Sequence, residues 1–231
     1  SNLFQNKSAF NDDIGNWDVS NVTTMFEMFF RASEFNQNIS SWNVSKVKNM
    51  QEMFSNATAF NQDISGWEVD SVTTFGWMFK EAPAFNQNIA NWTVSNATNM
   101  QEMFNGATAF DQDLSSWDVS KVINMNSMFE NASSFNQDIS SWNVSKVTDM
   151  GNMFENNTDL SDWNQCAINA AFSSNGNWPF DWSSSCYTFT SNQALHNAVD
   201  LWVSDKSSAV ASYGEINTWI VSQITDMSSL F

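Results

Sequence analysis

The chain has 231 residues and a formal net charge of −17, from 8 basic and 25 acidic side chains, and only 14% of its residues are charged. So few basic residues exclude a nucleic-acid footprint and attraction to anionic lipid headgroups. No apolar run approaches the ~18 residues that a membrane span needs, so we expect no membrane insertion within this sequence. The 20 phenylalanines and 12 tryptophans supply a sizeable core, which excludes disorder.

An internal repeat with a period of 25 residues occupies the first two thirds of the chain. A phenylalanine precedes each repeated tryptophan by seven residues, and a methionine follows it eleven residues later. A fixed period of this kind is typical of solenoids, in which each unit buries its apolar face against its neighbours. We therefore expect a solenoid over residues 1–157, with one coil for each repeated tryptophan: Trp17, Trp42, Trp67, Trp92, Trp117 and Trp142.

Within one repeat, the apolar residues Ile39, Trp42, Val44 and Val47 reproduce the spacing of leucine-rich repeats. We predict a short strand over residues 42–45, then an N-cap at Ser45 and a helix from Val47, because the next apolar residues follow at helical spacing. The return segment, residues 60–64, is expected to point its Phe and Ile inward and to stack its polar side chains on their copies. The predicted fold class is therefore α/β, a leucine-rich-repeat-like solenoid of strand-helix coils.

The full pattern F-N-Q-D-I-S-x-W-x-V-S-x-V-x-x-M-x-x-M-F-x-x-A is similar to the repeat of BspA-type leucine-rich-repeat surface proteins, a family of mycoplasma lipoproteins and microbial surface proteins. This resemblance covers residues 1–157 and a partial copy at the C-terminus. It implies an extracellular or cell-surface setting and a role in adhesion. It also implies no common enzymatic activity, so we expect neither catalytic residues nor a cofactor.

Residues 158–190 break the period and contain both cysteines of the chain, Cys166 and Cys186. Terminal repeats of solenoids are atypical because they close an open core end, so we expect this region to be an irregular C-terminal cap. The surface-protein resemblance favours an oxidising compartment, and we predict a disulfide between the two cysteines. The alternative is a pair of buried free thiols.

Helical spacing returns in residues 191–218, at Leu195, Ala198, Val199 and Trp202. A second helical stretch is expected to end before Gly214. We interpret residues 191–218 as the helical cap of a following array. Residues 219–231 then match the start of a repeat from its tryptophan onward, which predicts the first part of a restarted coil.

Both ends of the sequence carry repeat residues that a solenoid buries, so we expect each end to expose apolar side chains unless another module covers it. This expectation predicts an extracellular structural and adhesive module that joins identical modules head to tail, in a tandem array or a filament. The expected contact residues are Leu3, Phe4, Phe10 and Trp17 at one end and Trp219, Met227, Leu230 and Phe231 at the other.

A second hypothesis is a cell-surface binding module that recognises glycans or host proteins through the concave strand face. The outward residues beside the repeated tryptophans would form this face: Asn16, Asp18, Ser41, Asn43, Glu68, Asn91, Thr93 and Asp118. The two hypotheses differ in whether the ends or the side of the solenoid make the functional contacts.

Acidic residues recur in register, as at Asp13, Asp63 and Asp113, and calcium could relieve their mutual repulsion. Asn38 and Asn88 interrupt this ladder, however, and no calcium-loop motif occurs. We therefore expect solvated or hydrogen-bonded ladders rather than calcium sites. Acidic residues spread along a stack do not converge in one cleft, and the chain has a single histidine. Both observations count against an enzyme.

Overall fold

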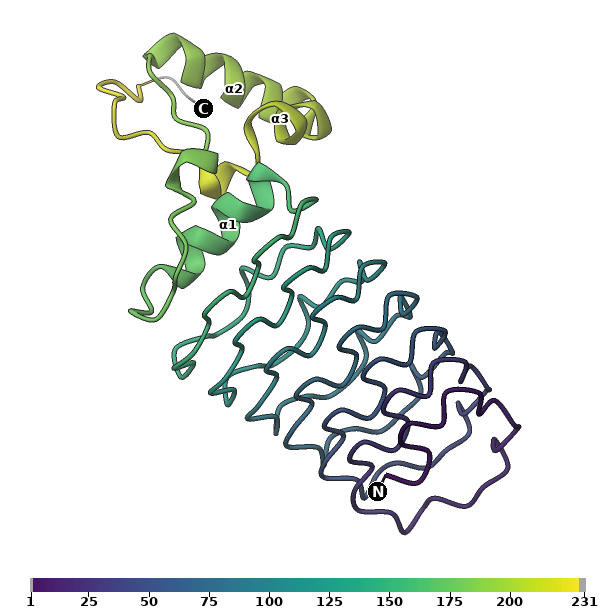
Figure 1. Cartoon of the computed structure of the whole chain (residues 1–231). Helices are drawn as coiled ribbons and strands as arrows, with labels where there is room; N and C mark the ends of the chain where they lie inside the picture. The colour runs from purple at the N-terminus through teal and green to yellow at the C-terminus, as the bar shows by residue number, and fades with distance from the viewer. Residues whose placement is uncertain (1, 229–231) are drawn as a thin grey trace.

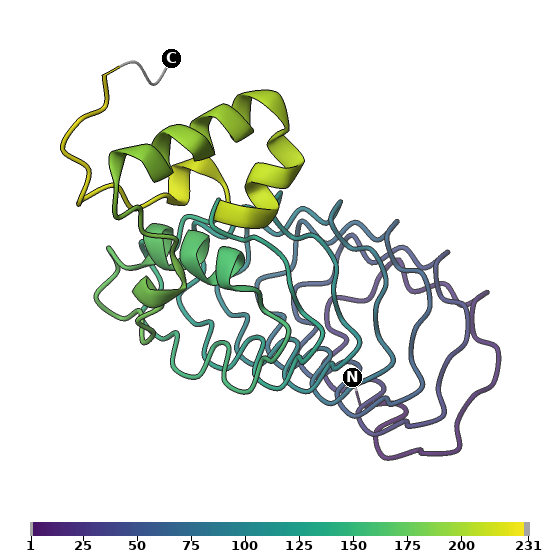
Figure 2. The ribbon, with the colours of Figure 1, turned by 90° about the horizontal axis from the view of Figure 1, so that it is seen from above.

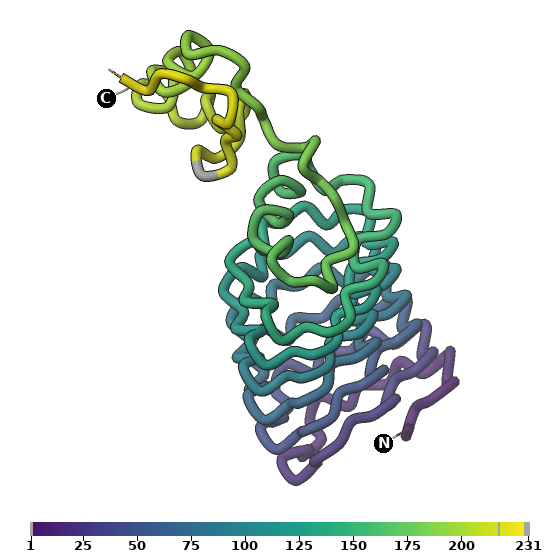
Figure 3. The backbone as a smooth tube through the Cα atoms, turned by 90° about the vertical axis from the view of Figure 1, so that its left-hand side faces the viewer, coloured from purple at the N-terminus to yellow at the C-terminus, as the bar shows by residue number. Residues whose placement is uncertain are grey.

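The computed structural model describes residues 2–228 as an elongated stack of coils with helices at its C-terminal end (Figure 1). The described helices are α1 (Asp162–Phe172), α2 (Asn192–Ser204) and α3 (Lys206–Tyr213), with short 3-10 turns η1 (Ser183–Ser185) and η2 (Ile216–Thr218). Residues 2–157 repeat the same coil without helices or extended strands. The view from above and the backbone tube both show the coils in register along one axis (Figures 2 and 3).

Stacked aromatic rings fill the centre of every coil. The Phe85 ring, which is fully buried, lies 3.8 Å from the Phe79 ring of its own coil and about one coil spacing from Phe60 and Phe110, at 6.1 and 5.9 Å. Because the same contacts recur between all adjacent coils, the apolar core is continuous along the stack. Burial of one coil therefore depends on its neighbours, as expected for a repeat protein.

The prediction of a helix from Val47 is wrong, although the residues that define it are buried as expected. Glu52 and Asn56 have positive φ values of 56° and 58°, in the left-handed region that interrupts an α-helix. The N–H of Met53 donates to the carbonyl oxygen three residues before it, at 3.1 Å, and the N–H of Phe54 donates to Met78 of the next coil, at 2.9 Å. Turns and bonds between coils thus replace the helical ladder.

The predicted strand at residues 42–45 is also absent. The N–H of Trp42 donates to Ile39 O and that of Val47 to Val44 O, so local turns use these donors. Ser45 is not an N-cap, because no helix follows it; its N–H instead donates to Asn43 Oδ1 at 3.1 Å. Adjacent coils are instead joined by parallel bridges at a single position per coil, through Thr24, Asn49, Thr74, Asn99, Asn124 and Asp149.

Polar side chains of the return segment stack between coils, as the sequence predicts. Asn86 Oδ1 accepts hydrogen bonds from the N–H of Asp111, at 3.0 Å, and from Gln112 Nε2, at 2.7 Å. The same pair of bonds recurs in each neighbouring coil, and Asp111 replaces asparagine as the acceptor in one of them. This ladder fixes the register of the coils, because a slip would leave its partly buried amides unpaired.

Replacing Asn86 with alanine is expected to lower the free energy of unfolding by about 1–2 kcal/mol, because the N–H of Asp111 and the amide of Gln112 lose their acceptor. Asn86→Asp is the matched control, since Asp111 makes the same bonds one coil later. Chemical unfolding followed by tryptophan fluorescence measures both. Equal losses in the two variants would contradict the assignment of this effect to the acceptor oxygen.

The C-terminal unit contains a second, smaller core. Leu195, Ala198 and Val199 of α2 are buried there together with Phe189, and Trp219 packs against this cluster. Helix α2 begins after the N-cap Ser191, and α3 ends at Gly214, whose φ is +76°. The helical spacing in the sequence therefore predicts this unit correctly. None of the helices described is long and apolar enough to cross a membrane.

Candidate functional site

The C-terminal end of the stack is covered by α1 and the segment that follows it. The Asn175 side chain donates to the carbonyl oxygens of Val144 and Val147, at 2.7 and 2.9 Å. Trp182 packs edge-on against Phe154, the last phenylalanine of the coils, with ring centres 5.4 Å apart. The backbone acceptors and the aromatic face of the last coil therefore both have partners within the cap.

Helix α1 lies in the region that the sequence analysis treats as irregular. Ser161 accepts the N–H of Asn164 as its N-cap, and Asp162 stands in its first turn. Ile168 and Phe172, four residues apart, are fully buried. An N-cap, an acidic first turn and this apolar spacing are the sequence signals that identify such a helix.

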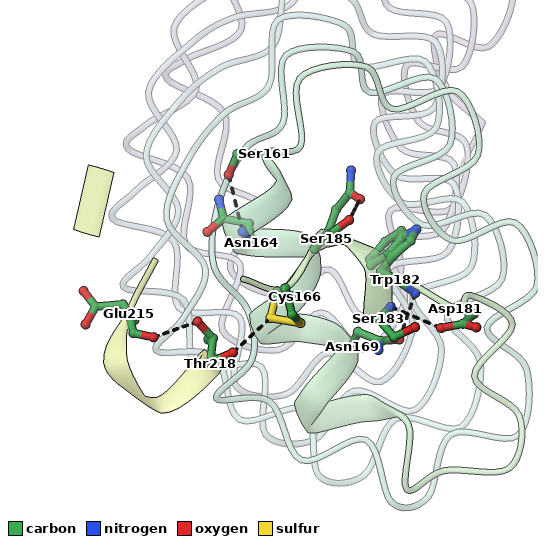
Figure 4. The surroundings of a disulfide bond; sticks show 12 residues. Ser161, Asn164, Cys166, Asn169, Asp181, Trp182, Ser183, Ser185, Glu215 and Thr218 are labelled. Atoms are coloured by element: carbon green, nitrogen blue, oxygen red, sulfur yellow. Dashed lines mark hydrogen bonds between the residues drawn. A yellow bond between two sulfur atoms is a disulfide. The ribbon is translucent and has the colours of Figure 1, made fainter. Parts of the chain in front are cut away.

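The predicted disulfide between Cys166 and Cys186 is present and joins α1 to the end of η1 (Figure 4). Cys166 is fully buried, and its Sγ lies 3.6 Å from the carbonyl oxygen of Thr218 in η2. Ser185 adds a second link to α1 by donating to Gln165 Oε1 at 2.8 Å. The disulfide thus stands where the cap of the stack meets the C-terminal unit.

The N-terminal end of the described stack is uncovered. Leu3 is 56% exposed and Trp17 43%, and Phe4 and Phe10 stack on each other with one side open. A shallow hollow of about 550 Å³, lined by residues 3–10 except for Gln5, lies on this side. Within residues 2–228, neither Trp17 Nε1 nor the N–H of Thr23 has a hydrogen-bond acceptor. The four contact residues predicted at this end therefore share one apolar face.

The restarted repeat forms the same local turns as the coils. The N–H of Ile224 donates to Val221 O at 3.0 Å and that of Trp219 to Ile216 O at 3.4 Å, matching Val47 and Trp42 of an ordinary coil. Trp219 is half-buried against α2 and α3, whereas Met227 is 51% exposed. The other two contact residues predicted at this end, Leu230 and Phe231, lie outside the described residues.

A polar face runs along the stack beside the buried tryptophans. Two exposed residues per coil form it, one before and one after each tryptophan, and they include all eight positions predicted for ligand recognition: Asn16, Asp18, Ser41, Asn43, Gly66, Glu68, Asn91, Thr93, Ser116, Asp118, Ser141 and Asn143. The face therefore exists, although no strand underlies it. Shallow hollows lie along it between successive coils.

Most residues of the polar face are engaged in hydrogen bonds within the stack. Ser116 Oγ donates to Ala90 O in the preceding coil at 2.9 Å, and Ser41 and Ser141 make the equivalent bond. After the tryptophan, Asp118 Oδ1 accepts the N–H of Ser120 at 3.0 Å, and Asp18, Asn43 and Asn143 do the same in their coils. The hydrogen-bonding groups of these side chains are therefore used within the stack.

The repeated acidic residues are exposed and accept hydrogen bonds from a backbone N–H two residues later in their own coil. The N–H of Ser65 and that of Ser115 hold the pKa of Asp63 and Asp113 below the ordinary value, and the Ser120 hydroxyl acts similarly on the pKa of Asp118. A carboxylate that accepts such bonds is stabilised in its charged form. Across residues 2–228, no group of three or more His, Cys, Asp or Glu side chains could hold a metal ion.

The chain was compared with known proteins. A family model described as "Mycoplasma protein of unknown function, DUF285" matches it twice, over residues 1–92 and 77–175. The comparisons with curated proteins and with solved structures found no significant match. The family match covers the whole stack of coils and continues through α1.

Proposed function

Because the chain belongs to the DUF285 family, whose matches span its repeats, we propose that it is an extracellular structural and adhesive module that joins identical modules head to tail through the ends of its coil stack. The likeness to BspA-type surface proteins is part of this proposal. A disulfide supports an oxidising compartment outside the cytosol. The proposal assigns no catalytic residue and no cofactor.

The contact between two modules is proposed to copy the contact between two coils. Inside the stack, three kinds of hydrogen bond join the tryptophan side of one coil to the next. They run from Trp67 Nε1 to Ile39 O at 3.2 Å, from the N–H of Thr73 to Lys48 O at 2.9 Å, and from the N–H of Met50 to Thr74 O at 3.1 Å.

Both ends of the described chain carry the corresponding groups. At the N-terminal end, Trp17 Nε1, the N–H of Thr23 and the carbonyl oxygen of Thr24 occupy the register of Trp67, Thr73 and Thr74. On the restarted repeat, Ile216 O, Thr225 O and the N–H of Met227 occupy the register of Ile39, Lys48 and Met50. The unpaired donors at the first coil therefore match acceptors at the other end, and apolar side chains flank both sets. This complementarity is the observation that carries the proposal.

Replacing Trp17 with serine is expected to weaken end-to-end association at least about tenfold, because the interface loses its central aromatic ring and one hydrogen bond. Sedimentation of the whole chain over a range of concentrations measures the association, and negative-stain microscopy shows whether the longer species are linear. Ile123→Ser is the matched control: Ile123 is 48% exposed on the side of the stack, similar to the 43% of Trp17.

A photo-crosslinker at position 17 is expected to capture a peptide that contains Ile216 of a second molecule. Isolated monomers at every concentration would contradict the proposal, and so would equal weakening by the two substitutions. A two-copy fusion joined in the repeat register tests the same contact within one chain. The coils at the junction should unfold with a higher transition midpoint than the first coil of the single chain, because they then have a neighbour on both sides.

A further inference from the structure

The polar face departs from its own hydrogen-bond pattern in two adjacent coils. Gly66 and Asn91 replace the serine that donates to the preceding coil in three other coils, at Ser41, Ser116 and Ser141. In the same two coils, Glu68 and Thr93 replace the Asp or Asn that elsewhere accepts a backbone N–H two residues later. Gly66 has no side chain to make such a bond, and the side chains of Glu68, Asn91 and Thr93 make none within the described part of the chain. All four departures thus meet at one place.

Two backbone acceptors are left open by these replacements. Where serine is present, it donates to the carbonyl oxygen 26 residues earlier, as Ser41 does to Gly15 O at 2.8 Å. The equivalent carbonyl oxygens for Gly66 and Asn91 belong to Ser40 and Ser65, and neither accepts a hydrogen bond from any described residue. The stack therefore lacks, at this site, two of the hydrogen bonds that join its other coils.

The same residues line a hollow on the polar face. Its volume is about 480 Å³, and Gly66, Glu68, Asp70, Asn91 and Thr93 all contribute to its lining. A smaller hollow of about 210 Å³ shares Gly66 and Glu68 and contains Ser40. A Cβ atom built on Gly66 would meet nothing within 4 Å, so the glycine leaves open space rather than relieving a clash.

We propose that this double hollow is a binding site for a neutral saccharide whose ring hydroxyls span the two coils. Hydroxyl groups both donate and accept hydrogen bonds, and the site offers both partners. The carbonyls of Ser40 and Ser65 and the carboxylates of Glu68 and Asp70 accept, whereas the amide of Asn91 and the hydroxyl of Thr93 also donate. An ammonium ligand only donates, so it would leave the Asn91 amide without an acceptor.

The test is a titration of the isotope-labelled whole chain with neutral linear oligosaccharides of glucose, N-acetylglucosamine, mannose and galactose, followed by NMR. Chemical-shift changes are expected at residues 65–70 and 91–95. The variant Gly66→Ser/Asn91→Ser restores the serine pattern of the neighbouring coils and closes both carbonyls. It should weaken binding at least about tenfold while leaving thermal stability unchanged or raised. Ser116→Gly, which opens one position on another coil, is the matched control and should leave the affinity unchanged.

Three results would overturn the assignment. The first is the absence of binding by every oligosaccharide in the set. The second is binding that the double variant leaves intact. The third is a salt-sensitive response to 1,6-diaminohexane at the same residues that is stronger than the response to any of the sugars. The site lies on the side of the stack, away from both ends, so its failure and the failure of head-to-tail association are separate outcomes.

Discussion

Replacing Phe85 with alanine is expected to lower the free energy of unfolding by about 3–5 kcal/mol, one of the largest effects of any single substitution in the stack. Phe85 is fully buried, and its ring contacts three others, those of Phe60, Phe79 and Phe110. Removing it leaves a cavity that the neighbouring coils cannot fill without breaking their own register. Guanidinium unfolding followed by tryptophan fluorescence measures the loss.

Phe10→Ala is the matched control, because Phe10 occupies the same register at the open end of the stack and is only partly buried. Its ring packs on Phe4 and Phe35 and has no coil on its other side. We expect clearly less than half of the Phe85 effect. Equal losses at the two positions would mean that the stack does not gain its stability from contacts between coils.

The sequence is sufficient to predict which residues form the core, because their identity repeats with the coil. Phe60, Met53 and Val47 are buried as the period requires. It does not distinguish helix from turns, because the same apolar spacing suits both. The backbone of each coil forms three-residue turns and otherwise bonds to adjacent coils, through contacts 24 to 26 residues apart. Local propensity carries little information about such contacts.

A signal for the turns is nevertheless present. Asn6, Asn56, Asn131 and Asn156 stand at equivalent positions of their coils, all with positive φ, and the same position in another coil is Gly106. Asparagine and glycine adopt this conformation more readily than other residues. Their recurrence at fixed positions within the expected helix is evidence against that helix. Glu52 and Trp77 also have positive φ, although their residue types do not favour it, so the pattern cannot be recognised from a single repeat.

The polar face is predictable because its residues flank a tryptophan that the repeat places in the core, and polar residues at these positions stay at the surface. The special character of Gly66, Glu68, Asn91 and Thr93 was not predictable. Their special character depends on the carbonyl oxygen that the equivalent serine bonds in three other coils. That carbonyl oxygen lies 26 residues earlier in the sequence. A substitution in a repeat becomes informative only when the contact made by its equivalents is known.

Removing the disulfide by Cys166→Ala/Cys186→Ala is expected to lower the free energy of unfolding by about 3 kcal/mol, from the entropy that a closed loop of this length removes from the unfolded chain. The two cysteines are separated by 20 positions, and the loop between them carries Trp178 and Trp182, which cover Phe154. Loss of the crosslink therefore loosens the one covered end of the stack. Denaturant unfolding with and without reductant measures the effect.

Reductant provides the internal control for this prediction. It should destabilise the wild-type chain by a similar amount and leave the double alanine variant unchanged, because that variant has no cysteine to reduce. The fluorescence of Trp178 and Trp182, compared in single Trp→Phe variants, should change before that of the coil tryptophans. Such an order follows from the architecture, since the cap contacts only the last coil, whereas each interior coil is held from both sides. Simultaneous loss of all signals would instead show that the cap and the stack unfold as one unit.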